Sequence, residues 1–227
     1  MTKLIFALHG RDLGDSLRAS DFRDRVRTAG AHRLQVNLDD ADVAVAPLRF
    51  GPGTPITAVV SLWLADVVTD GLVADVVTVV RDLDPSADGW RVEERLPIEP
   101  PSVPDGVRAE ALANLAFLRR PENMAHEAWR SDWLDRHTTV AIETQGTFGY
   151  VQNPVVEPIT PDAPAVAGIV EELFPMAAMT DDHAFYGSGG DPAELGLRFT
   201  RLMDSVARFG ADRGLDLVPT SRYLWRL

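Results

Sequence analysis

The sequence contains no cysteine among its 227 residues. Without cysteine a chain can form no disulfide bond, thiolate zinc site, iron–sulfur cluster or cysteine nucleophile, and the absence fits a reducing compartment. Long apolar runs are missing too, since no stretch approaches the ~20 apolar residues of a membrane span. The apolar run near the N-terminus, Leu4 to Leu8, is too short for a signal-peptide core. We therefore expect a cytoplasmic protein with no membrane partner.

Positive charge is scarce in this chain. Its 22 Lys and Arg residues face 34 Asp and Glu residues, which gives a net charge of -12. Phosphate backbones and anionic surfaces repel such a chain, so we expect no nucleic-acid partner. Hydrophobic residues make up 45% of the chain and charged residues 25%, which is typical of a soluble globular protein.

Proline is concentrated in one place, the segment from Leu96 to Gly106, which holds four prolines and interrupts both helix and strand patterns. We interpret this segment as a linker between two domains, residues 1–100 and 101–227. The two parts also resemble each other. An offset of 111 places Leu4 on Leu115, Phe6 on Phe117, Asp21 on Asp132, Phe22 on Trp133 and Arg25 on Arg136, and five inserted residues bring 34–37 onto 150–153. The sequence therefore predicts an internal duplication with a degenerate first copy.

Each part shows the pattern of a βαββαβ unit. The expected strands of the first part are 3–9, 32–46, 56–65 and 90–96, with helices at 15–29 and 72–83. The expected strands of the second part are 112–119, 147–156, 165–174 and 215–227, with helices at 124–142 and 192–210. The predicted fold class is α+β, two ferredoxin-like repeats packed as an intrachain α+β barrel with helices outside and a cavity between the sheets.

The segment from Phe117 to Ala141, followed by Phe148 to Val156, resembles the EthD family. The features that carry the resemblance are a first strand ending in arginines, a helix with tryptophans, an Arg-His pair near the helix end and a strand reading Tyr-Val-Gln-Asn. The family lies in the dimeric α+β barrel group, so the resemblance implies that two fused units form the barrel within one chain.

Trp129, Trp133 and His137 follow at intervals of four residues, so they share one side of the predicted helix, which we expect to face the sheet. Val26 occupies the position of His137 in the first part. An imidazole titrates near pH 6.5 and can act as a general acid or base, so His137 is the first catalytic candidate. The alternative is a half-buried structural histidine that satisfies a carbonyl.

The strand that begins near Phe148 supplies the remaining candidates. Its alternation places Tyr150 and Gln152 on one face and Asn153 on the other, without deciding which face lines the cavity. Tyr150 is the second catalytic candidate, since a phenol can donate to a developing oxyanion, and packing is its alternative role. Trp129, Trp133, Gln152 and Asn153 are the candidate substrate-binding residues.

Two polar segments carry weaker signals. Asp181, Asp182 and His183 are metal-ligand types, but adjacent residues rarely point at one ion, so we expect no metal. The glycine-rich run after Tyr186 lacks the ending of a phosphate loop. We interpret it as a flexible loop and candidate lid ahead of a helix that begins with Asp191 as N-cap.

A cavity between apolar sheets suits a small hydrophobic, aromatic or polyketide-like molecule. We therefore expect a cofactor-independent lyase, cyclase or decarboxylase that uses His137. The alternative is a non-catalytic binding or carrier protein. Haem chemistry is the least supported, because no motif marks an axial histidine, and we expect no cofactor. Since the barrel needs no second chain, the expected state is a monomeric pseudo-dimer, or a homodimer formed through another surface.

Overall fold

The computed structural model describes residues 1–65 and 67–227. The first half contains the elements β1 (Thr2–Leu8), α1 (Gly14–Arg18), α2 (Ser20–Thr28), β2 (Arg33–Leu38), β3 (Ala58–Leu64), α3 (Asp70–Leu83), β4 (Asp88–Val92) and β5 (Arg95–Ile98). The second half contains β6 (Leu112–Leu118), α4 (His126–Ser131), α5 (Thr138–Thr144), β7 (Gly149–Pro158), β8 (Gly168–Phe174), α6 (Asp182–Tyr186), α7 (Pro192–Arg208) and β9 (Asp216–Arg226).

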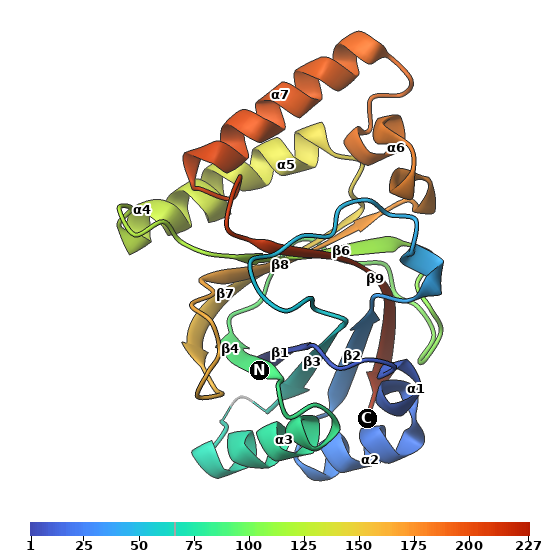
Figure 1. Cartoon of the computed structure of the whole chain (residues 1–227), viewed down its shortest axis with the longest axis vertical. Coiled ribbons are helices and arrows are strands. Elements are labelled where there is room, and N and C mark those ends of the chain that lie inside the picture. The colour runs from blue at the N-terminus through green and yellow to red at the C-terminus, as the bar shows by residue number, and fades with distance from the viewer. Residues whose placement is uncertain (66) are drawn as a thin grey trace.

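The strands form a closed antiparallel barrel. Their order is β4-β1-β3-β2-β9-β6-β8-β7, and β7 pairs back with β4 to close the ring. Each half has the strand order of a ferredoxin-like sheet, with its fourth strand beside its first. The pairs β2–β9 and β4–β7 join the two sheets. The α+β barrel expected from the sequence is confirmed. Figure 1 shows α2 and α3 beneath one sheet and α4, α5 and α7 above the other.

Alternation along the strands sorts the side chains into two layers. In β1, Leu4, Phe6 and Leu8 pack against the helices of the first half, while Ile5 and Ala7 point into the barrel. The apolar part of the interior draws on both halves: Ile5, Ala7, Ile56, Val59, Trp90, Val92, Leu115, Phe117, Val166, Ile169 and Val218. A ligand cavity in this interior is therefore lined by residues from both sheets.

The predicted alignment of the two halves is only partly consistent with this layering. Leu4 belongs to the helix-facing core, whereas Leu115 faces the barrel interior. An offset of 111 is therefore wrong for β1 and β6, because a slip of one residue moves a side chain to the other face. The alignment of 34–37 with 150–153 does place residues of the same layer together. The division at residue 100 stays a prediction.

Four predicted elements are subdivided in the structure. The strand expected at 32–46 ends at Leu38 and is followed by a 3-10 helix, Ala41–Val43. The helix expected at 15–29 breaks at Ala19, which is extended (φ -66°, ψ 150°). The strand expected at 90–96 becomes β4 and β5, both of which pair with β7. The helix expected at 124–142 contains a π-helical turn, Asp132–His137, between α4 and α5. None of the helices formed by residues 1–65 and 67–227 has the length and apolarity to cross a membrane.

Candidate functional site

The π-helical turn determines where His137 points. Trp129 and Trp133 pack on Gly168 of β8, where the rings leave no room for a Cβ atom. His137 instead faces α7, with Nδ1 3.0 Å from the Oγ of Ser205 and its ring against Phe209. The prediction that His137 joins both tryptophans on the sheet side was therefore wrong, because a π turn adds a residue to the helical turn and rotates the later side chains around the helix axis.

Burial is the largest cause of the pKa shifts of His137 and Tyr150. It lowers the pKa of His137 to about 4, so the imidazole is neutral near pH 7. Burial also raises the pKa of Tyr150 above its usual range. The Nε2 atom of Gln152 donates to the Tyr150 hydroxyl (3.2 Å) and to the Oγ1 of Thr138 (2.9 Å). His137, Tyr150 and Gln152 thus lie in the layer between the second sheet and its helices.

Asn153 is the one predicted site residue that faces the barrel interior. Its Oδ1 accepts from the Nζ of Lys3 at 2.8 Å, and its Nδ2 donates to the Ile169 carbonyl at 3.0 Å. Across the described part of the chain, the cavities at the two ends of the barrel do not include any of the six candidates, which are Trp129, Trp133, His137, Tyr150, Gln152 and Asn153. Their roles in binding and catalysis stay predictions.

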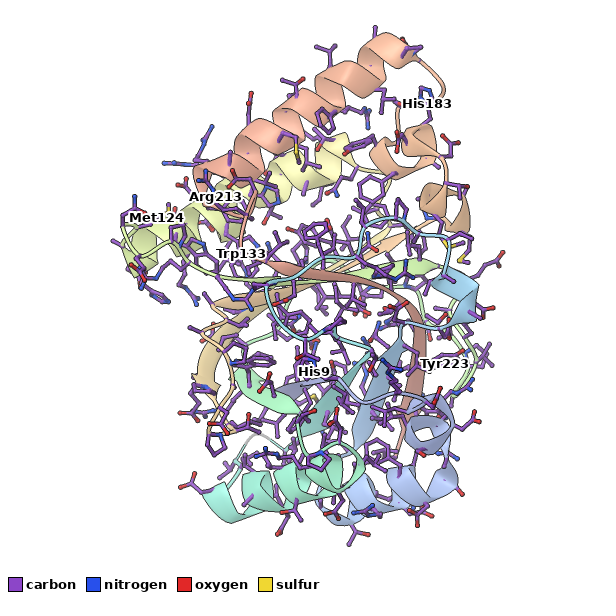
Figure 2. The ribbon with its side chains drawn as sticks, in the orientation of Figure 1. His9, Met124, Trp133, His183, Arg213 and Tyr223 are labelled. Atoms are coloured by element: carbon purple, nitrogen blue, oxygen red, sulfur yellow. The ribbon has the colours of Figure 1, made fainter. Side chains whose placement is uncertain are left out.

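The stretch from Asp181 to Asp191, which holds α6 and leads into α7, has a capping role. Asp181 accepts from the backbone N–H of His183 (2.8 Å), whose Nδ1 lies 2.6 Å from the Oγ of Ser188. Asp191 accepts from the backbone N–H groups of residues 193 and 194, which confirms it as the N-cap of α7. Figure 2 shows His183 at the outer end of α6 and α7, away from His9, so this segment does not cover the cavity beside His9. Within residues 1–65 and 67–227, no three His, Asp or Glu side chains form a metal-sized cluster.

A cavity of about 430 Å³ opens at the end of the barrel where β1 ends and β4 begins, and its size is typical of small-molecule sites. The lining comes from both halves: Ala7, His9, Pro52, Gly53, Thr54, Ile56, Ser86, Asp88, Trp90, Phe117, Arg119, Pro164, Val166 and Asp216. We call it the mouth cavity.

The floor of the mouth cavity is aromatic. The rings of Trp90 and Phe117, one from each half, lie with centroids 5.7 Å apart and planes inclined at 52°. Both side chains are almost completely buried. The indole N–H of Trp90 donates to the carbonyl of Pro164 at 3.3 Å, which leaves the ring faces apolar. Two tilted rings of this kind favour a flat, apolar ligand.

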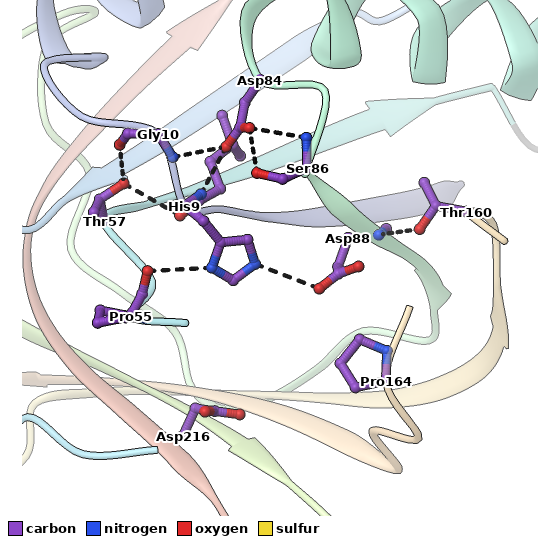
Figure 3. A network of polar contacts seen from close by, with 12 residues as sticks. His9, Gly10, Pro55, Thr57, Asp84, Ser86, Asp88, Thr160, Pro164 and Asp216 are labelled. Carbon is purple, nitrogen blue, oxygen red and sulfur yellow. Dashed lines mark hydrogen bonds and ion pairs between the residues drawn. The ribbon is translucent and has the colours of Figure 1, made fainter. Parts of the chain in front are cut away.

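His9 and Asp88 meet at the rim of this cavity (Figure 3). The Nδ1 of His9 lies 3.1 Å from the Pro55 carbonyl, which can only accept, so Nδ1 carries the proton. The Nε2 atom then faces the Oδ2 of Asp88 at 3.4 Å. The side chains of His9 and Asp88 are 14% and 20% exposed, so the pair is shielded yet reachable from the cavity.

Asp88 is the acidic member of this pair. Burial raises its pKa above the usual value, while the hydrogen bond and charge of His9 act in the opposite direction. A carboxylate with a raised pKa is a stronger base, and the Nε2 atom of an imidazole that carries its proton on Nδ1 can accept a proton. Together His9 and Asp88 can accept or return one proton at the edge of an apolar cavity.

Asp84 holds His9 in place. Its Oδ2 accepts from the backbone N–H groups of His9 (2.7 Å) and Gly10 (2.9 Å), while its Oδ1 accepts from the hydroxyl of Ser86 (2.5 Å). Burial by itself would raise the pKa of Asp84, but these hydrogen bonds together lower it below the usual value. Asp84 is therefore an ionised anchor that fixes the chain leaving β1.

The opposite wall of the mouth cavity carries a second charged pair. Arg119 and Asp216 form an ion pair with 2.6 Å between Nη2 and Oδ2, and Arg119 also donates to the Gly214 carbonyl. The chain at Phe50 is pinned nearby by two backbone hydrogen bonds with Leu217. Residues 52–56 leave this point and form one rim of the cavity. Arg119 and Asp216 lie in close contact at 2.6 Å, whereas His9 and Asp88 are 3.4 Å apart, so His9 and Asp88 are the candidate proton-transfer groups of this cavity.

Sequence reasoning missed His9 and Asp88 because they are 79 residues apart and belong to no motif. The order of the strands could have indicated that these two residues are close together. A βαββαβ unit places its first and fourth strands side by side, and β1 pairs with β4 so that Ala7 lies opposite Asp88. A histidine just after the first strand therefore lies near an aspartate at the start of the fourth.

The closed barrel, its outer helices and the cavity at one end define a single-chain α+β barrel. No family model and no curated protein matches the sequence. A putative monooxygenase from Lactobacillus acidophilus NCFM is a structural neighbour at 12% identity and a TM-score of 0.51, over 99% of this chain and 95% of that chain. An anthrone oxidase-like protein has 9% identity and a TM-score of 0.55, over 99% and 92%. At such identities the likeness shows a shared fold, and membership of the EthD family stays a prediction.

Proposed function

We propose that this protein binds a small aromatic compound in the mouth cavity and transfers a proton between that compound and the His9–Asp88 pair. The observation that carries the proposal is the position of a shielded imidazole–carboxylate pair at the edge of an aromatic-floored cavity. The name of one structural neighbour, an anthrone oxidase-like protein, supports an aromatic ligand.

The proposed chemistry begins with the ligand lying flat on Trp90 and Phe117. Its phenolic O–H or acidic C–H points toward the rim, where the pair accepts the proton. The Pro55 carbonyl holds the Nδ1 proton of His9, so exchange runs through Nε2 and the Asp88 carboxylate. A positioned base of this kind contributes roughly 10² to 10⁴ in rate. The reaction class is a cofactor-independent lyase or cyclase step that starts from proton abstraction.

Binding is the first test. Anthrone and 1-naphthol should quench tryptophan fluorescence saturably, because both would lie against Trp90. Phe117→Ala removes half of the aromatic floor and should weaken binding by about tenfold or more, which is roughly 1.4 kcal/mol. Phe199→Ala is the control, since Phe199 is 48% exposed on α7 and does not belong to the cavity lining. Equal affinities for the two variants would contradict the assignment of the cavity.

Proton transfer is the second test. The wild-type protein should accelerate exchange of the methylene hydrogens of anthrone with D₂O under argon, as followed by NMR. Asp88→Asn should lower this rate by about 10² or more while anthrone still binds. Saturable binding without accelerated exchange in the wild-type protein would overturn the catalytic half of the proposal and identify a carrier.

A further inference from the structure

A second cavity, of about 220 Å³, lies at the opposite end of the barrel, where β1 begins. It shares no lining residue with the mouth cavity. Four cationic side chains line it: Lys3, Arg33, Arg222 and Arg226. Only three carboxylates accompany them, those of Glu94, Glu99 and Glu171. This local excess of positive charge contrasts with the net charge of -12 of the whole chain.

Three of these charges belong to one row of the sheet. Lys3 lies opposite Trp63, Trp63 opposite Arg33, and Arg33 opposite Arg226, across β1, β3, β2 and β9. The Nζ of Lys3 is 4.5 Å and the Cζ of Arg33 is 4.2 Å from the centre of the Trp63 ring. The indole thus fixes two cations at the edge of the cavity.

Two of the three carboxylates, Glu94 and Glu171, already form ion pairs with Lys3 and Arg222. Glu94 accepts from the Nζ of Lys3 at 2.8 Å and from the indole N–H of Trp63 at 3.1 Å. Glu171 accepts from the Nε of Arg222 at 3.1 Å, and both side chains are nearly completely buried. Lys3 and Arg222 are therefore neutralised within the barrel.

Arg33 is different. Within the described residues, no carboxylate lies within ion-pair distance of its guanidinium, and its buried Nε atom has no hydrogen-bond partner. Its cross-strand neighbour Arg226 carries the same charge, and directly opposed like charges destabilise a sheet. Burial is the largest cause of the lowered pKa of Arg33; the charges of Glu94 and Glu171 act against it, and those of Arg222 and Arg226 add to it. An anion beside Arg33 would relieve both the missing partner and the repulsion.

We propose that this second cavity binds an oxyanion group, a carboxylate or a phosphate, through the guanidinium of Arg33 with Arg226 alongside. A guanidinium presents a planar fork of N–H donors that matches two oxygens of either group. Leu96, Pro100, Pro101 and Leu224 form an apolar wall around the cations, so a ligand with a small organic body can bind there as well as the bare ion.

The test uses sodium benzoate and inorganic phosphate as probes at low ionic strength, with sodium chloride as the matched salt. Calorimetric titration and melting temperature are measured for the wild-type protein, Arg33→Gln and Arg213→Gln. Arg213 is the control because its side chain is 81% exposed and, among the described residues, forms an ion pair only with its neighbour Asp212. Arg33→Lys keeps the charge without the fork, and it replaces Arg33→Gln if that variant does not fold.

We expect at least one probe to bind saturably to the wild-type protein and to Arg213→Gln, and to raise both melting temperatures. Affinity for that probe should fall tenfold or more in Arg33→Gln and in Arg33→Lys. Binding of benzoate alone assigns a carboxylate ligand, and binding of phosphate alone assigns a phosphate ligand. Equal affinity of Arg33→Gln and the wild-type protein, or no saturable binding of either probe beyond chloride, would overturn the proposal.

Discussion

The Nδ1 atom of His137 lies 3.0 Å from the Oγ atom of Ser205, so a hydrogen bond ties the π-helical turn before α5 to the last turn of α7. The imidazole ring is buried and also packs on Phe209. A buried polar group needs such a partner, and here the partner lies within the helix layer. We infer that His137 fixes the position of α7 on the barrel.

This inference predicts a pH dependence of folding. The pKa of His137 is about 4 in the folded protein, against the ordinary value of 6.5 that applies to the unfolded chain. The unfolded chain therefore binds more protons between these values, and stability at pH 7 is lost as pH falls from 6.5 to 4. The loss is on the order of 3 kcal/mol. Urea unfolding at pH 4, 5, 6 and 7 should show a smaller loss for His137→Gln than for the wild-type protein. Identical losses would contradict the inference.

Glu172 lies on the side of β8 that faces the helices. The shift of its pKa predicts the opposite dependence of stability on pH. Burial raises its pKa from 4.5 to about 7, with a weaker opposing contribution from a hydrogen bond with Gln145. The folded protein therefore holds a proton that the unfolded chain releases, so stability is complete below pH 4.5 and falls as pH rises to 7. Glu172→Gln should abolish this fall and be the more stable protein at pH 8, by up to about 3 kcal/mol. A variant that is less stable than wild type at pH 8 would contradict the assignment.

The fold was more accessible from the sequence than the site. Strand and helix periodicity predicted two βαββαβ units because each element buries one face, and Asp191 followed by proline marked a helix start that the structure confirms. The sequence could not show which way the His137 side chain points, because a spacing of four residues is the same in the sequence whether the helix is α-helical or contains a π turn. The His9–Asp88 pair depends on the register between β1 and β4, which no local pattern specifies. The alignment of Leu4 with Leu115 was wrong because no local pattern shows which side of a buried strand faces the barrel interior.

A substitution of Asp84 tests whether its hydrogen bonds keep His9 in position at the mouth cavity. Its carboxylate accepts from the backbone N–H groups of His9 and Gly10, so Asp84→Ala leaves buried donors unpaired and should cost about 1–3 kcal/mol of stability. We also expect weaker anthrone binding, because His9 loses its backbone anchor. Asp82→Ala is the matched control, since Asp82 is 56% exposed and forms a surface ion pair with Arg25. Similar melting temperatures and affinities for the two variants would show that Asp84 does not organise the site.

Deuterium exchange at the methylene carbon of anthrone, compared among His9→Gln, Asp88→Asn and the double variant, tests most directly whether His9 and Asp88 form one proton-transfer unit. Each rate is taken at saturating anthrone, with binding confirmed by fluorescence, so that a change reports the chemical step. Groups that act as a unit are strongly non-additive. The account predicts that each single variant loses about 10² or more in rate and that the double variant is no slower than the slower single variant. Wild-type rates in both single variants, or losses that multiply in the double variant, would contradict it.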